Sequence, residues 1–552
     1  LRMSNLVVAA AGGISANGLG YRGGGLLTNV NPRSTYGWGP SGGTCGNARG
    51  GGGGHGGEGG NGWEGGTRFS TYGSASYPTT AGSGGGGGYI GYSGCGGGVV
   101  RVTASGSVTV NGTLSADGTR ASSYSGGGAG GSVFIECGRL EGSPTGLISA
   151  RGGDGWAPKE GWYNGGGGGG GRLAVFYNPA LQTNNPGVRF STTPGPGMEA
   201  GRMGTLFLPN TLFLGEALGN QWLDVRVQSP GFTNWSPASL DVRDSRIGFG
   251  ANQFDLRVAG ALTVGSGGGL LLYPHDELRC GELMLTNGGF LTVYSGTNKA
   301  AMESYGALVN AGGTFAIGPG SWVYPYSNPT NNGSALFRVR ALKIAAAGGI
   351  NADGKGYWGG GRGSPPGTAG WGPGAGFTYN ARGGGGGHGG AGRAGEEGPG
   401  GATNDSAAVP LFPGSGGGGG YNSRAGSGGG AVRVAAEREI AVDGTISANG
   451  TNSFEYGGGG AGGSIYLDSY YLRGGTSGVL RANGGSGYSY SDNRISGGGG
   501  GGGRIALHYM FSRAQWTCSV NGGMGTNTTV FGDPGTVYWI QKPLPPTVFM
   551  VF

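Results

Sequence analysis

The chain has 552 residues, of which 144 are glycine and only 11% are charged, with a formal net charge of +7. Glycine usually makes up about 7% of a protein, so ordinary globular packing is excluded as a complete description of the fold. Lys and Arg are scattered and nowhere form a run of four, which indicates a solvated surface and no nucleic-acid partner. No stretch of 18 apolar residues occurs, so we expect no membrane span.

The glycine runs at 165–171 and 497–503 have few ordered conformations open to them. Oligoglycine makes a poor helix, and it gives a strand no side chains to pack. The extended left-handed threefold helix remains, and it points its N–H and C=O groups outward. Because such groups need partners once water is excluded, we expect these segments to form hydrogen bonds sideways to one another.

A duplication organises the chain. Residues 5–21 match residues 341–357, and the match continues with Trp38 and Trp371, His55 and His388, and Arg172 and Arg504. Repetition on this scale indicates stacked units that bury one another's faces. We therefore divide the chain into copy 1 (1–208), a connector (209–340) and copy 2 (341–552).

A short signature, [Ile/Leu]-x-Ala-[Asn/Asp/Arg]-Gly, occurs three times in each copy. It starts at Ile14, Leu114 and Ile148, and again at Ile350, Ile446 and Leu480. Its apolar residue and alanine share one face of a strand, and the Asn/Asp-Gly pair that follows in most instances predicts a tight turn with positive φ. Each glycine-rich excursion then returns into an alternating strand, at 100–102, 133–135 and 173–175, and at 432–434, 465–467 and 505–507.

The connector lacks the excursions but keeps the strands. Residues 260–264 align with 281–285 and 270–273 with 291–294, a repeat of about 21 residues, and 306–317 form a slightly longer third coil. Short strands and glycine corners at this spacing predict an all-β parallel β-helix or solenoid. No segment shows the helical apolar period over ten positions, so we expect almost no helix. The simplest synthesis is one column of coils, from which the excursions project as bundles of polyglycine II helices.

The end of the chain combines a strand at 536–540, a proline-containing linker and an apolar segment with Val548, Phe549, Val551 and Phe552. The last strand of a solenoid has unpaired backbone N–H and C=O groups along one edge, and these can pair with another strand. Two interpretations stay open: the tail adds as a strand to a neighbouring subunit, or it folds back as a cap.

The five cysteines carry information because the chain repeats. Cys45 and Cys95 are replaced together in copy 2, by Thr378 and Ser427. This is the pattern of a disulfide present in one copy and absent from the other, although chance replacement explains it as well. A disulfide would imply an oxidising, extracellular setting. The others have no evident mates and are expected to be buried apolar residues: Cys137, Cys280 and Cys518.

Catalytic and metal-binding candidates are sparse. His55 and His388 sit in matching glycine-rich settings without converging ligands, which favours donation to backbone carbonyls over a metal or catalytic role. Asp241 with Asp244, and Asp276 with Glu277, are the closest carboxylate groupings, and no opposed arrangement follows from their positions. We expect no enzyme activity, no cofactor and no metal.

Aromatic residues inside the excursions offer a second kind of site. Four tryptophans there either stack on glycans or pack between the glycine segments and the solenoid: Trp38, Trp63, Trp358 and Trp371.

The runs at 7–13, 49–57 and 84–91 resemble the glycine-rich domains of anaplastic-lymphoma-kinase-type receptor ectodomains and of phage tail-fibre adhesins. The resemblance implies hexagonal bundles of polyglycine helices with a role in binding or display. The chain also resembles long secreted bacterial repeat proteins built on β-solenoids. No functional residue carries over. We expect a secreted, cell-surface structural protein, the self-associating subunit of an extracellular filament, with a glycan-binding adhesin or a polysaccharide-active β-helix enzyme as alternatives.

Overall fold

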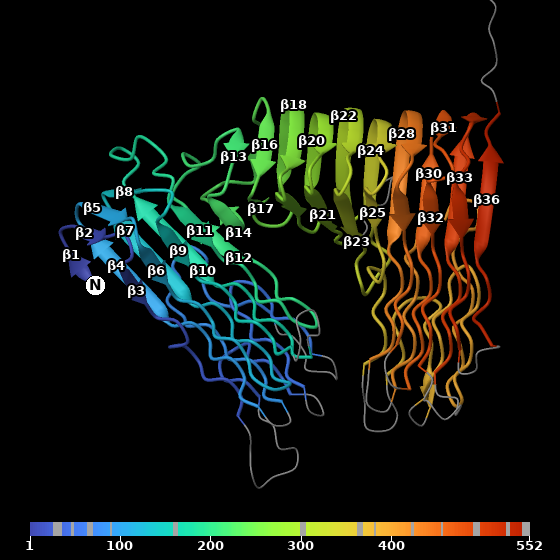
Figure 1. Ribbon diagram of the computed structural model, residues 1–552, viewed down its shortest axis with the longest axis horizontal. Coiled ribbons are helices and arrows are strands. Elements are labelled where there is room, and N and C mark those ends of the chain that lie inside the picture. The colour runs from blue at the N-terminus through green and yellow to red at the C-terminus, as the bar shows by residue number, and fades with distance from the viewer. Residues whose placement is uncertain are drawn as a thin grey trace, which may run out of the picture. The chain divides into compact units, whose positions relative to one another are not determined.

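The computed structural model describes residues 1–25, 36–45, 49–62, 70–88, 91–157, 164–297, 305–361, 368–379, 382–420, 424–453, 456–488, 497–525 and 530–543. The chain divides into two compact units, each described by itself below. Unit 1 comprises Leu1–Asn234, Val242–Ala251 and Gly269–Leu271, and unit 2 comprises Trp235–Asp241, Asn252–Gly268 and Leu272–Phe552. The described ranges contain strands and no helix, as predicted (Figure 1). The boundaries of the two copies and the connector follow the sequence repeat and stay predictions.

Unit 1 is built from parallel strands of successive coils. The longest series pairs β1 (Arg2–Met3), β4 (Val99–Ala104), β7 (Ser132–Cys137), β10 (Arg172–Tyr177), β12 (Gly204–Phe207), β14 (Trp222–Gln228), β17 (Arg246–Phe249) and β19 (Gly269–Leu272). A second series pairs β3 (Gly13–Ser15), β6 (Thr113–Ser115), β9 (Leu147–Ser149), β11 (Arg189–Ser191) and β14. A third pairs β2 (Leu6–Val8), β5 (Ser107–Val110) and β8 (Arg139–Gly142).

Unit 2 repeats this construction. Its longest series pairs β18 (Asp255–Gly265), β20 (Glu277–Leu285), β22 (Ala307–Ile317), β24 (Ala335–Ile344), β28 (Ala431–Val442), β30 (Ser464–Asp468), β33 (Arg504–Tyr509) and β36 (Thr536–Gln541). A second pairs β21 (Phe290–Tyr294), β23 (Trp322–Tyr326), β25 (Gly349–Asn351), β29 (Thr445–Ser447), β32 (Val479–Arg481) and β35 (Thr517–Ser519). A third continues from β28 through β31 (Tyr471–Arg473) to β34 (Phe511–Ser512).

Five short strands complete the described elements of the chain. Three of them lie in sequence between β12 and β18: β13 (Ala217–Leu218), β15 (Asn234–Trp235) and β16 (Leu240–Arg243). A small antiparallel hairpin joins β26 (Thr378–Tyr379) to β27 (Arg382–Gly383).

The core of each unit is a stack of like residues at equal positions in successive coils. In unit 1, Val133 pairs with Val100 on one side and with Leu173 on the other, and all three are buried. Since alternate residues of a strand face the same side, this register places every second side chain of the three predicted returning strands in the core. The all-β parallel architecture predicted from the sequence is therefore confirmed at the level of a solenoid-type fold.

The coil spacing predicted for the connector is also confirmed. Leu262 pairs with Leu283 and Val264 with Leu285, as the sequence repeat requires. Leu283 in turn pairs with Phe315, an offset of 32 residues against 21 for Leu262 and Leu283. The third coil is therefore longer, as predicted, but by more than the slight difference expected.

The Asn/Asp of the repeated signature forms a ladder along the coils. In unit 2, the Oδ1 of Asp353 accepts from the N–H of Asn449 at 2.6 Å, the Oδ1 of Asn449 accepts from Asn483 at 2.8 Å, and that of Asn483 accepts from Asn521 at 2.8 Å. In unit 1 the same bonds run from Asn17 through Asp117 to Arg151. The signature thus supplies one side-chain acceptor per coil for a backbone donor of the next coil.

The predicted positive φ is confirmed at two of the five Asn/Asp-Gly pairs of the signature and is wrong at the other three. Gly18 and Gly354 adopt φ of 66° and 63°, whereas Gly118 and Gly450 do not have a positive φ. Glycine is needed there for another reason: a Cβ on Gly118 would lie 2.2 Å from the carbonyl oxygen of Gly128. Close approach of a neighbouring backbone, rather than turn conformation, selects glycine at these positions.

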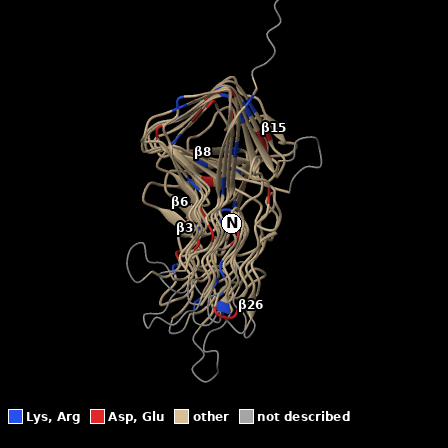
Figure 2. Cartoon of the chain, turned by 90° about the vertical axis from the view of Figure 1, so that its right-hand side faces the viewer, with Lys and Arg blue, Asp and Glu red and all other residues tan. Residues whose placement is uncertain are grey.

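The glycine-rich excursions leave the strands and run as extended segments beside one another within each unit, below the arrows in Figure 1. Charged residues occupy only short, scattered stretches of the ribbon, and most of the extended segments carry none (Figure 2). Packing in this part of the molecule therefore depends on backbone groups.

Candidate functional site

The segment 126–131 of unit 1 donates its backbone hydrogen bonds with a period of three residues. Gly126 and Ala129 donate to the segment 83–86, Gly127 and Gly130 donate to 166–169, and Gly128 and Gly131 donate to 116–119. The N···O distances lie between 2.7 and 3.1 Å. Three consecutive N–H groups therefore reach three different neighbours, and the fourth returns to the first.

The carbonyl groups of the same segment reach other neighbours. The oxygens of Gly126 and Ala129 accept from the N–H groups of Gly94 and Gly97, and the Gly127 and Gly128 oxygens accept from Gly53 and Gly153. The segment 126–131 is therefore surrounded by six others. We call these seven segments of unit 1 the glycine lattice: 50–55, 82–86, 94–97, 116–119, 126–131, 150–156 and 165–171.

Unit 2 contains an equivalent lattice. Gly458 and Ala461 donate to 415–418, Gly459 and Gly462 donate to 498–501, and Gly460 and Gly463 donate to 448–451. The duplication therefore preserves the hydrogen-bond partners, not only the composition.

A side chain on these glycines would collide with neighbouring backbone. A Cβ on Gly168 would lie 2.0 Å from the Gly128 carbonyl oxygen, and one on Gly500 would lie 2.1 Å from the Gly460 oxygen. Real Cβ atoms essentially never approach backbone below 3.0 Å. The lattice spacing therefore admits only glycine at these positions.

The lattices hold the two histidines singled out in the sequence. His55 is fully buried, with Nδ1 2.9 Å from the Gly130 carbonyl oxygen and Nε2 3.0 Å from Thr80 Oγ1. Because a carbonyl oxygen only accepts, Nδ1 carries the proton, and the expected donation to a backbone carbonyl is confirmed. His388 differs: its ring nitrogens lie 3.0 Å from Asn404 Oδ1 and 2.8 Å from Ser464 Oγ.

Burial keeps both imidazoles neutral. Desolvation, together with the nearby Arg172 guanidinium, lowers the pKa of His55 to about 4. Desolvation also lowers the pKa of His388 to about 4, and Asp405 opposes this shift. A neutral, fully buried imidazole without a convergent acid or base suits a structural role.

Two arginines lie near these histidines. In the sequence they were noted only as matching positions of the repeat. Arg172 Nε donates to the Tyr72 carbonyl at 2.8 Å and Nη1 to Thr205 Oγ1 at 3.1 Å. Arg504 repeats this pattern with the Asn404 carbonyl at 3.0 Å and Thr536 Oγ1 at 3.1 Å. Their matched positions in the repeat were the available signal that both are structural parts of the lattice edge.

The excursion tryptophans within the described ranges are solvent-accessible. Trp38, Trp358 and Trp371 expose 67%, 41% and 49% of their surface. Trp371 donates its backbone N–H to the Trp358 carbonyl at 2.9 Å, which places the two residues in adjacent segments of copy 2. Trp63 lies outside the described residues, as do Val548, Phe549, Val551 and Phe552 of the tail.

The described part of the chain contains no disulfide bond. The segment 82–86 accepts a bond from Gly43, near Cys45, and donates one to Gly94, beside Cys95. The two cysteines thus flank different neighbours of one lattice segment, and their pairing stays a prediction. Cys137 and Cys280 are buried as expected, whereas Cys518 is half-buried.

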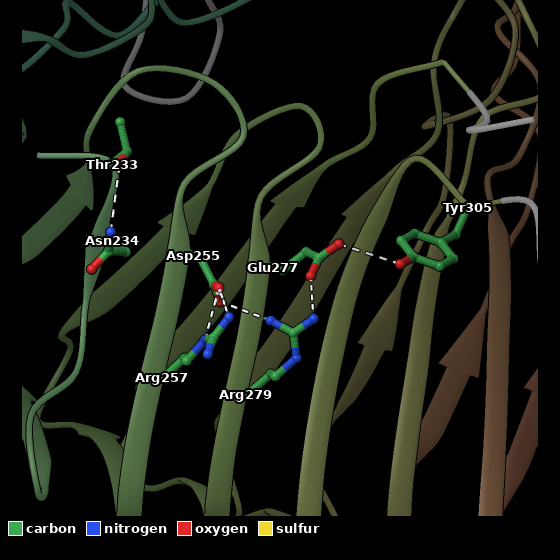
Figure 3. A network of polar contacts seen from close by, with 7 residues as sticks. All are labelled: Thr233, Asn234, Asp255, Arg257, Glu277, Arg279 and Tyr305. Atoms are coloured by element: carbon green, nitrogen blue, oxygen red, sulfur yellow. Dashed lines mark hydrogen bonds and ion pairs between the residues drawn. The ribbon is translucent and has the colours of Figure 1, made fainter. Parts of the chain in front are cut away.

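Two of the four carboxylates considered as catalytic candidates, Asp276 and Glu277, are engaged in structural contacts. Asp276 accepts from the backbone N–H of Phe254 at 2.8 Å and of Tyr273 at 2.7 Å. Glu277 forms an ion pair with Arg279, whose other terminal nitrogen bonds Asp255 at 2.8 Å (Figure 3). Asp255 and Glu277 are paired across β18 and β20, so Arg279 screens two neighbouring like charges.

No three His, Cys, Asp or Glu side chains of the described residues gather closely enough to hold a metal ion. In the same ranges, no helix is long and apolar enough to cross a membrane. No protein-family model, curated protein or solved structure matches the chain.

Proposed function

We propose that the protein is a structural component of an extracellular fibre or surface assembly, in which the glycine segments form bundles of polyglycine II helices. The observation that carries the proposal is the three-residue period of the hydrogen bonds of segment 126–131, which has six neighbours. A polyglycine II helix has three residues per turn and no internal hydrogen bonds. Such a helix directs successive N–H groups to three neighbours, which a hexagonal bundle satisfies.

Mechanical stiffness follows from this arrangement. Every residue of the segment is tied sideways, so a load on one segment is shared by its neighbours through backbone bonds. The same lattice is built twice, and Lys, Arg, Asp and Glu colour little of this part of the ribbon (Figure 2). A framework made of backbone groups suits support and display better than catalysis.

Self-association is supported by a comparison of the two copies. Tyr21 and Val99 of the first coil expose 39% and 40% of their surface, whereas the matching Tyr357 and Ala431 of copy 2 expose 4% and 0%. In copy 2 the connector strands β22 and β23 pair with β24 and β25 and cover this face. A coil of a second copy, or a further coil of a longer chain, would bury the equivalent face of copy 1.

Negative-stain electron microscopy across a concentration series tests the proposal. We expect fibres that lengthen with concentration for the wild type and short particles for Val99→Glu. Val409→Glu changes another valine, 38% exposed, and serves as the matched control. Monodisperse wild-type particles at the highest concentration would contradict the filament.

A glycan-binding adhesin is the second candidate, and the exposure of Trp38, Trp358 and Trp371 favours it. Tryptophan faces that are open to solvent can stack on sugar rings. Binding to a glycan array that disappears in a Trp38→Ala and Trp371→Ala double variant would support this candidate.

A further inference from the structure

Unit 2 contains a groove that was not predicted from the sequence. It has a volume of about 570 Å³ and lies between β31, β33, β34 and the end of β36. Its lining combines aromatic rings with hydrogen-bond donors: Tyr471, Tyr509, Phe511, Arg473, Arg513 and Gln541, together with Leu472 and Ser512. The volume falls within the range of about 300–1,000 Å³ found for ligand sites.

The aromatic wall of the groove is built from rings that hold one another in place. Tyr471 and Phe511 stack with centroids 5.2 Å apart and an interplanar angle of 25°. Tyr470 contacts both, with centroids 4.8 and 5.5 Å away. Phe511, which lines the groove, and Tyr470 beside it each still expose 39% of their surface, so aromatic ring surface remains open to a ligand.

The charge of the groove is positive. Arg473 lies 5.2 Å above the Tyr471 ring and forms an ion pair with Glu439 at 3.5 Å. Lys542, next to Gln541, is paired with Asp468. Arg513 donates its backbone N–H to the Leu472 carbonyl at 2.9 Å, and its side chain is exposed and has no ion-pair partner among the described residues. One guanidinium is therefore available to an anionic ligand.

Copy 1 shows that the fold does not require this lining. The positions of Tyr470, Tyr471, Phe511 and Arg513 are occupied there by Gly138, Arg139, Pro179 and Leu181.

The backbone at this place also differs between the copies. In copy 1 the Gln182 side chain bonds the N–H and C=O of Leu140 at 2.8 and 3.0 Å and closes the strand edge. In copy 2, β34 pairs with β31 instead, and the groove opens beside it. The same scaffold thus carries the aromatic and basic lining in one copy only.

We propose that this groove binds an acidic oligosaccharide, with a sugar ring stacked on Phe511 and a sugar carboxylate on Arg513. The C–H face of a pyranose packs on an aromatic ring, and a guanidinium binds a carboxylate through two parallel hydrogen bonds. The side chains of Ser512 and Gln541 can form hydrogen bonds with sugar hydroxyl groups. The site is independent of the structural role proposed above, because a single unpolymerised chain would bind the same ligand.

Calorimetric titration of the full chain with hexagalacturonate tests this site, with cellohexaose as the uncharged probe of equal length. We expect saturable binding of hexagalacturonate, at least tenfold weaker binding of cellohexaose, and at least tenfold loss of affinity in Phe511→Ala and in Arg513→Leu, the residue of copy 1. Phe377→Ala removes an exposed ring elsewhere in unit 2, 49% of whose surface is accessible, and should leave the affinity unchanged. All variants are compared by thermal unfolding, since the substituted side chains lie at the surface.

Any one of four results would overturn the inference. The first three are that the wild type fails to bind hexagalacturonate, that the two groove variants bind it as well as the wild type does, and that cellohexaose binds as tightly as hexagalacturonate. Binding that appears only after deletion of 544–552 would also overturn it, because the tail itself would then be the natural occupant. None of these results bears on fibre formation, so the two proposals fail separately.

Discussion

Replacing Gly168 by alanine is the most direct test of the glycine lattice. The added Cβ would lie 2.0 Å from the Gly128 carbonyl oxygen, so one of the two segments must move by about 1 Å or more to reach an ordinary contact. Gly168 donates to Gly153 at 2.9 Å, and its carbonyl accepts from Gly195 at 2.8 Å. A displacement of that size breaks both bonds, since N–H···O distances beyond about 3.5 Å no longer count as hydrogen bonds.

The expected cost follows from these two bonds. Each of the two broken bonds costs about 1–3 kcal/mol through the buried groups that it leaves unsatisfied, and the stiffer unfolded chain of an alanine variant offsets up to about 1 kcal/mol. The free energy of unfolding of unit 1 should therefore fall by about 1–5 kcal/mol.

Urea unfolding followed by tryptophan fluorescence measures this change. Gly215→Ala is the matched control, because nothing lies within 4 Å of its added Cβ. If Gly168→Ala unfolds within about 0.5 kcal/mol of Gly215→Ala, a difference typical of surface substitutions, the reasoning about lattice spacing is refuted.

Three further predictions concern unit 2. His388 is neutral in the fold, where its pKa is about 4 against 6.5 in the unfolded chain. Its contribution to stability is therefore complete above pH 6.5, and about 3 kcal/mol is lost as the pH falls through 4. Urea unfolding at pH 7 and at pH 4.5 should show a smaller loss of stability for His388→Gln than for the wild type. Asn449→Ala removes the acceptor for the Asn483 N–H and should cost about 1–3 kcal/mol in thermal unfolding, whereas Asn449→Asp, the residue type at position 117, should cost less than half as much. Arg279→Ala removes the guanidinium shared by Asp255 and Glu277, while Arg257 still pairs with Asp255, so the change should cost up to about 1 kcal/mol. The effect should shrink between 0.05 and 1 M salt, and a salt-independent loss would contradict the electrostatic explanation.

Much of the strand architecture could be predicted from the sequence because side chains encode it. The alternation in 133–135 and 173–175 gives both the strands and the buried face, and the duplication gives the stacking. A period of two is a property of side-chain placement, so it is visible in one chain without its partners.

The neighbours of each glycine segment could not be predicted in the same way. Gly127 and Gly128 are chemically identical, yet one donates to Gly166 and the other to Thr119. That choice depends on the rotation of the segment about its own axis, and no side chain records it. The Asn ladder was missed for a related reason, since the Asn/Asp-Gly pair is a strong turn signal that concealed a contact between coils.

The groove of unit 2 was missed because its residues are distant in sequence and ordinary in type. Tyr471 and Phe511 each continue a strand pattern, and only the pairing of β31 with β34 brings their rings together. The available signal was a difference between the two copies of the repeat, because Pro179 of copy 1 is aligned with Phe511 of copy 2.

The three-residue period of the lattice sets a rule for how such a chain can evolve. Each residue added to or removed from the interior of segment 126–131 turns the rest of that segment by about 120°, so every later N–H faces a different neighbour. Insertions and deletions of three residues restore the original directions, whereas those of one or two scramble them. Length changes inside lattice segments should therefore accumulate in triplets among descendants of this chain, while the turns that join the segments remain free to vary by any number.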